Sequence, residues 1–419
     1  MRIPRWLAAP EDATATQRKN LLLVQADAIP IGVYAATGLF LPIFLARLGA
    51  TGLQVGLLTA LPALTGFLLS VALGRTLQSR RNIVPWYAAS RLLVTSTYTA
   101  LGLLPFFVPR QLVLRGTLCI WALSTIPQTV QAITFPVVMN AVAGPHGRFS
   151  LMSRRWSLLS LTTAVATAIA GQVLDRLPFP INYQWVFVTL SLGGWFSYYL
   201  SRRITLPDST PAEQTPSRSL RENLSGLAKR VWGESAFVSF AVRRFIFQAG
   251  ATLALPLFPL YFVRVVRASD AWIGIISTAQ TAAVLVGYFL WARQARSRGS
   301  RFVLLSTTLC VGLYPALIAT TRQANWIAVY AALAGFSQAG LDLVFFDELM
   351  QRVPLAHSAT FVALAQSLQH LASFFAPLLG TVLADRFGLS SGLLLSAALC
   401  FAGFTLFARS DQGRGVAKG

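Results

Sequence analysis

The sequence predicts an all-α membrane protein with twelve transmembrane helices arranged as two pseudo-symmetric six-helix bundles. Hydrophobic residues make up 55% of its 419 residues and charged residues only 12%, whereas charged residues make up about 25% of a typical soluble domain. Many apolar stretches are long enough to cross a hydrocarbon layer ~30 Å thick, which takes roughly 20 helical residues. The chain also repeats itself, because Pro145 and Gly171 recur 209 positions later as Pro354 and Gly380.

The twelve predicted spans are expected to be helices rather than strands. They are far longer than the roughly 9–11 residues of a membrane barrel strand and do not alternate with a period of two. Helices satisfy every backbone polar group within one segment, as a bilayer requires. The predicted spans are 20–46, 52–73, 83–108, 112–142, 150–175, 183–203, 235–265, 270–294, 301–321, 325–350, 357–384 and 389–408.

The repeat relates the two halves of the chain. Gly171 and Gly380 open the matching runs Gly-Gln-Val-Leu and Gly-Thr-Val-Leu, each soon followed by Asp-Arg. A second register, with an offset of 217 positions, matches Pro42 to Pro259. Duplicated halves related by a pseudo-symmetry axis are typical of transporters, which place their site near the bilayer midplane.

Two bundles joined by a polar linker are therefore expected, over residues 1–203 and 235–419. The intervening segment, 204–234, begins with the Pro/Ser/Thr composition of a flexible linker. Leu220, Leu224 and the apolar residues after them then recur at helical spacing. This spacing predicts a short amphipathic helix on the membrane surface, with an unstructured tether as the alternative.

The net charge of +21 is interpreted as a topology signal rather than as nucleic-acid binding. Lys and Arg cluster in alternate connections between predicted spans, and one such cluster contains Arg154 and Arg155. Under the positive-inside rule these connections and both termini are cytoplasmic. The remaining surplus suits attraction to anionic lipid headgroups. We expect a multi-pass monomer in the cell (inner) membrane, with no nucleic-acid partner.

Two short basic loops carry a family resemblance. They follow the second and eighth predicted spans, at residues 74–82 and 292–301. Both resemble, in degenerate form, the Gly-x-x-x-Asp-Arg-x-Gly-Arg-Arg loop of the major facilitator superfamily. In the second loop Gly299 and Arg301 fit the pattern, but Arg296 stands where the family has Asp. With twelve spans, a six-plus-six duplication and a charged central segment, the chain resembles this superfamily over nearly its whole length.

The resemblance implies a mechanism and a fold. Two six-helix domains would rock about a central cavity lined by the first, fourth, seventh and tenth helices. The expected function is secondary active transport of a small organic solute by alternating access, coupled to protons. One alternative is a drug/proton efflux antiporter, although the fifth span lacks the Gly-x-x-x-Gly-Pro-x-x-Gly-Gly signature of that subclass. The other alternative is a non-transporting membrane sensor that keeps the transporter fold.

Charged residues inside predicted spans are candidates for gating, because such charges are costly in a bilayer and usually face the protein interior or water. The 217-residue offset makes Asp27 of the first span equivalent to Arg244 of the seventh. These two are predicted to form an ion pair that opens and closes with the transport cycle. The alternative is that Asp27 belongs to an internal network while Arg244 extends to the cytoplasmic surface. Arg91, near the end of an outer helix, is expected to extend to that surface.

Proton coupling has two further candidates. Asp342 lies in the tenth span with Gln338 one turn earlier, and an apolar interior penalises its charge. It is the favoured proton carrier, with a structural ion pair to Arg243 or Arg91 as the alternative. His370 lies near the middle of the eleventh span, and the ordinary pKa of histidine, about 6.5, suits a proton relay. The alternative for His370 is a hydrogen-bonded packing role.

Amide and hydroxyl side chains within the spans are candidates for binding a polar solute. They are Gln25, Tyr34, Gln128, Gln131, Gln248, Gln280 and Gln338. Motifs of metalloproteases, nucleotide-binding loops and serine hydrolases are missing from the sequence, and its His and Cys residues lack metal-ligand spacing. The sequence thus predicts no enzyme activity, cofactor or metal site, and transport would have to be secondary.

Overall fold

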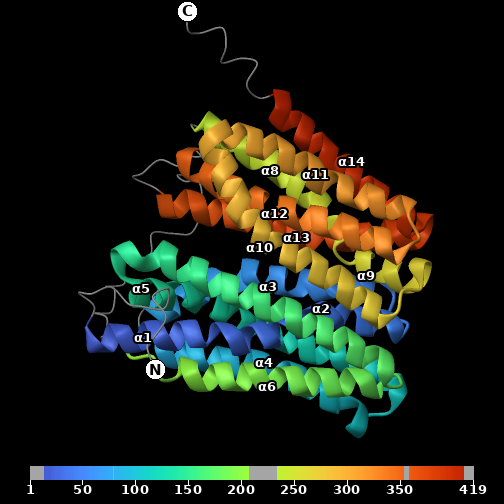
Figure 1. The fold of residues 1–419 in the computed structure, drawn as a ribbon, viewed down its shortest axis with the longest axis horizontal. Helices are drawn as coiled ribbons and strands as arrows, with labels where there is room; N and C mark the ends of the chain where they lie inside the picture. Colours follow the sequence, from blue (N-terminus) through green and yellow to red (C-terminus); the bar gives the residue numbers. More distant parts are fainter. Residues whose placement is uncertain (1–13, 79, 207–233, 353–357, 410–419) are drawn as a thin grey trace, which may run out of the picture. The chain divides into compact units, whose positions relative to one another are not determined.

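The computed structural model describes residues 14–78, 80–206, 234–352 and 358–409. Every regular element in these ranges is helical (Figure 1). The segment for which an amphipathic helix is predicted lies, from 207 to 233, outside the described residues. The elements are α1 (Ala15–Ala26), α2 (Ala28–Arg47), α3 (Gly52–Gln78), α4 (Val84–Phe107), α5 (Arg110–Arg176), α6 (Ile181–Ser201), α8 (Ser235–Ala254), α9 (Leu257–Tyr261), the π-helix η2 (Phe262–Val266), α10 (Asp270–Arg298), α11 (Ser300–Thr320), α12 (Ala324–Arg352), α13 (Ser358–Phe387) and α14 (Leu389–Arg409).

The helices confirm the predicted membrane class. Ten helical stretches of the described residues are long and apolar enough to cross a membrane. Helices α4 and α6, with 24 and 21 residues, coincide with the other two predicted spans, and at 1.5 Å per residue both exceed the hydrocarbon thickness. The spans predicted at 112–142 and 150–175 lie in one continuous helix, α5, which contains two separate apolar stretches.

Prolines interrupt the first and seventh predicted spans. The first is divided into α1 and α2 at Asp27, because Pro30 has no N–H to donate to the carbonyl of Ala26 one turn earlier. The seventh is divided after α8. Pro256 has no N–H to donate to the Thr252 carbonyl, which accepts a hydrogen bond from the N–H of Leu255 instead. The first break places Asp27 at a helix junction inside the membrane-spanning part of the chain.

The described chain forms two compact units with repeated packing. Unit 1 comprises Met1–Leu48, Leu68–Glu213 and Ser269–Thr278, and unit 2 comprises Gly49–Phe67, Gln214–Ala268 and Ala279–Gly419. In unit 1, α2 and α4 both pack on α5 and α6; in unit 2, α8 packs on α13 and α14 while α11 packs on α12 and α14 (Figure 1). Helices in equivalent places of the two sequence halves therefore make equivalent contacts, as the repeat predicts.

The boundaries of the two units pass through α3 and α10. In unit 1, Gly171 of α5 meets Gly274 of α10, and a Cβ on either would lie 3.0 Å from the other's Cα. Asp175 accepts a hydrogen bond from the first turn of α10. In unit 2, its repeat counterpart Asp385 lies so near Gly52 of α3 that a Cβ there would be 2.9 Å from the carboxylate. Small residues permit this close helix approach.

Two apolar clusters hold the helices around the charged residues. In unit 1 the buried cluster includes Val24 of α1, Tyr87 of α4 and Met139 of α5. In unit 2 the buried cluster is rich in aromatic residues, and the rings of Phe240 and Phe345 lie 6.3 Å apart in an edge-to-face arrangement. These clusters fix the backbones from which the candidate site residues project.

Candidate functional site

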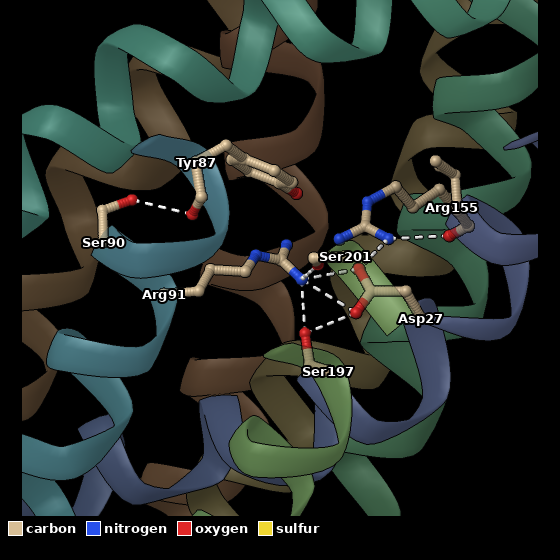
Figure 2. A network of polar contacts seen from close by, with 8 residues as sticks. Asp27, Tyr87, Ser90, Arg91, Arg155, Ser197 and Ser201 are labelled. Carbon is tan, nitrogen blue, oxygen red and sulfur yellow. Dashed lines mark hydrogen bonds and ion pairs between the residues drawn. The ribbon is translucent and has the colours of Figure 1, made fainter. Parts of the chain in front are cut away.

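Asp27 lies buried between two arginines (Figure 2). Nη1 of Arg91, from α4, donates to both carboxylate oxygens of Asp27 at 2.8 Å. Nη1 of Arg155, from α5, lies 2.8 Å from Asp27 Oδ2. None of these three side chains is more than 5% exposed. Side chains of two helices, α4 and α5, therefore converge on the carboxylate at the α1–α2 junction.

Hydroxyl groups of α6 complete this network. Arg91 Nη1 donates to Ser197 Oγ and, at 3.0 Å, to Ser201 Oγ. Ser197 Oγ in turn donates to Asp27 Oδ1. Arg155 Nη1 also donates at 2.8 Å to the carbonyl of Val24 in α1. Charge-assisted hydrogen bonds of this kind are stronger than neutral ones, so the network ties α1, α4, α5 and α6 together.

Both arginines also lie over aromatic rings. The guanidinium of Arg91 is 4.8 Å from the ring centroid of Tyr87, and that of Arg155 is 5.6 Å from the ring centroid of Phe135. Such contacts stabilise a desolvated cation. Nε of each arginine is buried and has no hydrogen-bond partner among the described residues.

The network borders a cleft of about 390 Å³ in unit 1. Its walls combine the two guanidinium groups, the amides of Gln128 and Gln131, and apolar surface. The complete lining is Ile31, Arg91, Gln128, Gln131, Ala132, Phe135, Arg155, Trp156 and Leu159. Gln128 Nε2 donates to Ser124 Oγ at 2.8 Å, which orients its amide. The structure thus brings together three predicted site residues, Arg91, Gln128 and Gln131.

A second polar group surrounds Asp342 on α12 in unit 2. Gln338 Nε2 donates to Asp342 Oδ1 at 2.8 Å. The hydroxyl of Tyr288, on α10, donates to Asp342 Oδ2 at 3.1 Å. Both donors are uncharged, and Arg244 interacts with the carboxylate electrostatically. Arg244 is therefore a cation that acts on this carboxylate and that the predicted alternatives, Arg243 and Arg91, did not include; Arg91 binds Asp27 instead.

Arg244 of α8 lines a small cavity in unit 2. Its Nη2 donates to Gln369 Oε1 at 3.4 Å, and its guanidinium lies 5.2 Å from the ring centroid of Phe345. Gln248, a predicted binding residue, lines the same cavity. The volume, about 20 Å³, corresponds to about one water molecule.

The remaining predicted residues are dispersed. Gln25 is buried in α1 with its Oε1 unpartnered among the described residues. The Tyr34 hydroxyl donates to the carbonyl of Val94 at 3.3 Å. Gln280 is half-buried on α10. Arg243 donates within its own helix to Ser239, while His370 lies against Gly66, where a Cβ would be 3.1 Å from its ring.

The structure corrects two sequence interpretations. Arg91 does not extend to the membrane surface, because its side chain is 3% exposed and bound to Asp27. Arg155 is not part of a surface cluster, because it is 1% exposed. Asp27 and Arg244 belong to different units, and the ion pairs and hydrogen bonds described above for each lie within its own unit. Their pairing in one transport state stays a prediction.

Four functional candidates escaped the sequence reasoning. Ser197 and Ser201 stand four residues apart in an apolar helix, which places both on one face, and that spacing is a usable signal. Arg155 lies five residues inside its predicted span, but the basic loop before it obscured this. Nothing in the sequence marked Tyr288 as a site residue, because single tyrosines are common in apolar helices. Among the described residues there is no His, Cys, Asp and Glu group that could hold a metal ion.

Comparison with known proteins identifies the fold. Residues 240–416 match the family model described as Major Facilitator Superfamily. No curated protein matches the chain in sequence. Solved structures of similar fold include the nucleoside transporter NupG (TM-score 0.68, 12% identity, 94% of this chain and 99% of that one). They also include a D-xylose-proton symporter (TM-score 0.71, 13% identity, 93% and 97%) and a bacterial metal transporter (0.65, 14%, 96% and 100%). At these identities the likeness shows the fold alone.

Proposed function

We propose that this chain is a membrane transporter of the Major Facilitator Superfamily, which moves a small organic solute by alternating access as a secondary active transporter. The observation that carries this proposal is the buried Asp27–Arg91–Arg155 network on the wall of an amide-lined cleft. Buried ion pairs add little net stability, and charges within spans usually mark a substrate or ion pathway.

Coupling to protons is assigned to Asp342. Asp27 is bonded directly to two guanidinium groups. If Asp27 became protonated, these buried cations would lose their counter-ion. Asp342 accepts its hydrogen bonds from the neutral groups of Gln338 and Tyr288, so a proton can come and go without breaking an ion pair. These contacts support Asp342 as the proton carrier. His370, on α13, is the second candidate for the relay.

Orientation follows from charge. We place both termini in the cytoplasm and the protein in the cell membrane, because the basic connections alternate along the chain. Single cysteines in a variant lacking Cys119, Cys310 and Cys400 test this. Exposed Gln323, between α11 and α12, should react with an impermeant maleimide in intact cells, and exposed Ser297, at the end of α10, should not. The reverse pattern would show that the orientation is inverted.

The transport function itself is tested by counterflow. Purified protein in liposomes preloaded with one unlabelled solute is mixed with a trace of the same labelled solute, over a panel of organic anions, sugars, nucleosides and cations. A carrier concentrates the label transiently without any imposed gradient. The same panel is then measured with a pH gradient, which separates coupled from uncoupled transport. If protein-containing and empty liposomes behave alike for every solute, the chain is not a carrier of these classes.

A further inference from the structure

The network of unit 1 contains more positive than negative charge. Arg91 and Arg155 both bind the single carboxylate of Asp27. Arginine stays protonated inside proteins, so one carboxylate balances only one of the two guanidinium groups. The side chains are at most 5% exposed, and an unbalanced charge at such a place is unfavourable.

The acidic residues described elsewhere in unit 1 do not supply the missing charge. Asp175 accepts a hydrogen bond from the first turn of α10. Asp270 is bound by Arg47, with 2.8 Å between Oδ1 and Nε, and by the hydroxyl of Tyr183 at 2.7 Å. Both carboxylates are therefore engaged where α10 begins. The rings beneath Arg91 and Arg155 offset part of the charge, but a ring is not a counter-ion.

The surplus charge lies on the wall of the cleft. Arg91 and Arg155 both line it, and Nε of each is buried without a partner among the described residues. Beside them are the amides of Gln128 and Gln131, whose N–H groups are suited to oxyanions. The rest of the lining is apolar and includes the flat side chains of Phe135, which lies at the Arg155 guanidinium, and Trp156.

We propose that the solute is an organic anion, with its carboxylate, sulfonate or phosphate at the guanidinium groups of Arg91 and Arg155 and its apolar body against the apolar part of the lining, which includes Trp156. The planar guanidinium group matches such oxyanions in geometry as well as in charge. A bound anion supplies the counter-charge that the described side chains of the network lack. This inference rests on the proposed transport function and narrows its substrate class.

The test compares three probes of one shape that differ in charge. Benzenesulfonate is the anion, benzenesulfonamide is its uncharged analogue, and benzylammonium is the cation. Binding of each to the full-length protein in neutral-lipid nanodiscs is measured by calorimetry in the same dilute Tris chloride buffer, which contains no organic anion and keeps competing chloride low. Benzenesulfonate should bind at least about tenfold more tightly than benzenesulfonamide, since charge-assisted hydrogen bonds are roughly twice as strong as neutral ones. Equal affinity for the two, or preference for benzylammonium, overturns the inference.

Substitutions that lower or raise the positive charge of the cleft distinguish recognition of the probe's charge from recognition of its shape. Arg155→Gln removes the surplus and leaves the Asp27–Arg91 pair, so benzenesulfonate affinity should fall at least about tenfold. Gln131→Glu adds a negative charge to the cleft without touching the network and should lower affinity similarly. Asp27→Asn increases the surplus, so benzenesulfonate should raise its unfolding midpoint more than that of the wild type. Arg202→Gln, an exposed arginine over Tyr198, is the matched control and should change nothing.

The outcomes distinguish this inference from the transport proposal. If Asp27→Asn does not fold, Arg155→Gln and Gln131→Glu decide the question, and unchanged benzenesulfonate affinity in both overturns the inference. Counterflow of neutral or cationic solutes, with no binding of the anion, overturns the inference and leaves the transport function standing. Anion binding that depends on Arg155 but is accompanied by no counterflow supports the anion site and contradicts transport.

Discussion

Asp27 in unit 1 and Asp342 in unit 2 are both acidic residues within membrane-spanning helices, but their partners differ in charge. Asp27 is held by two guanidinium groups and a serine hydroxyl, whereas Asp342 is held by an amide and a phenol. Protonation of the first carboxylate would break its ion pairs with Arg91 and Arg155. Protonation of the second would break no ion pair among those described, because its hydrogen-bond donors are neutral. The roles proposed for the two residues follow from this difference, binding and rigidity for Asp27 and proton exchange for Asp342.

The largest difference is expected when each carboxylate is neutralised. Asp27→Asn strands two buried guanidinium groups, and removing one partner of a buried ion pair costs about 3–5 kcal/mol of unfolding free energy. Asp342→Asn retains shape and hydrogen-bonding capacity, so it should cost less than about 1 kcal/mol. Unfolding of both variants in detergent, followed by tryptophan fluorescence against denaturant, measures the two losses. Equal losses would remove the distinction between the regions.

The sequence was sufficient for the fold because its main signals are length and repetition. Apolar stretches of membrane length predicted the spans, and the recurrence of Gly171 as Gly380 predicted equivalent packing in the two units. The sequence also contains the signal for the helix break at Asp27. Pro30, three residues after Asp27, has no N–H for the helical hydrogen bond to the Ala26 carbonyl.

The sequence did not predict which residues the site residues bind. Asp27 and Arg91 were each recognised as charges inside spans, but which residues meet across helices depends on helix rotation, and periodicity does not specify it. Arg155 shows the complementary difficulty. A basic residue close to a basic loop gives the same sequence signal whether it extends to water or turns inward to a carboxylate.

A smaller effect is expected from the serine that bridges Asp27 and Arg91. Ser197→Ala removes hydrogen bonds to both charged groups, and hydrogen bonds to charges contribute about 1.5–3 kcal/mol. The control is Thr189→Val on the same helix, since the exposed Thr189 hydroxyl bonds, among the described residues, only to carbonyls of α6. The denaturant midpoint should fall for Ser197→Ala and stay within error for Thr189→Val. A midpoint unchanged in both would mean that the serine is not part of a functioning network.

A smaller effect than that of Ser197→Ala is expected at Arg244. Its removal strands no directly bonded carboxylate, because its hydrogen-bond partner is the amide of Gln369 and its ring partner is Phe345. Arg244→Gln should therefore cost about 1 kcal/mol of unfolding free energy, the value of one hydrogen bond plus part of a cation–π contact. Arg155→Gln, measured beside it, should cost more. The opposite order would place the structurally critical arginine in unit 2.

The most direct measurement of the central claim is solute-driven proton movement in liposomes that enclose a pH-sensitive dye. A solute identified by counterflow is added outside, with the membrane potential clamped by potassium and valinomycin. We predict that the wild type changes the internal pH when the solute enters, and that Asp342→Asn gives solute counterflow without any pH change. Asp347→Asn, an exposed carboxylate on the same helix, should behave as the wild type. A pH change that persists in Asp342→Asn, or counterflow in the wild type without one, would contradict the assignment of the proton to Asp342.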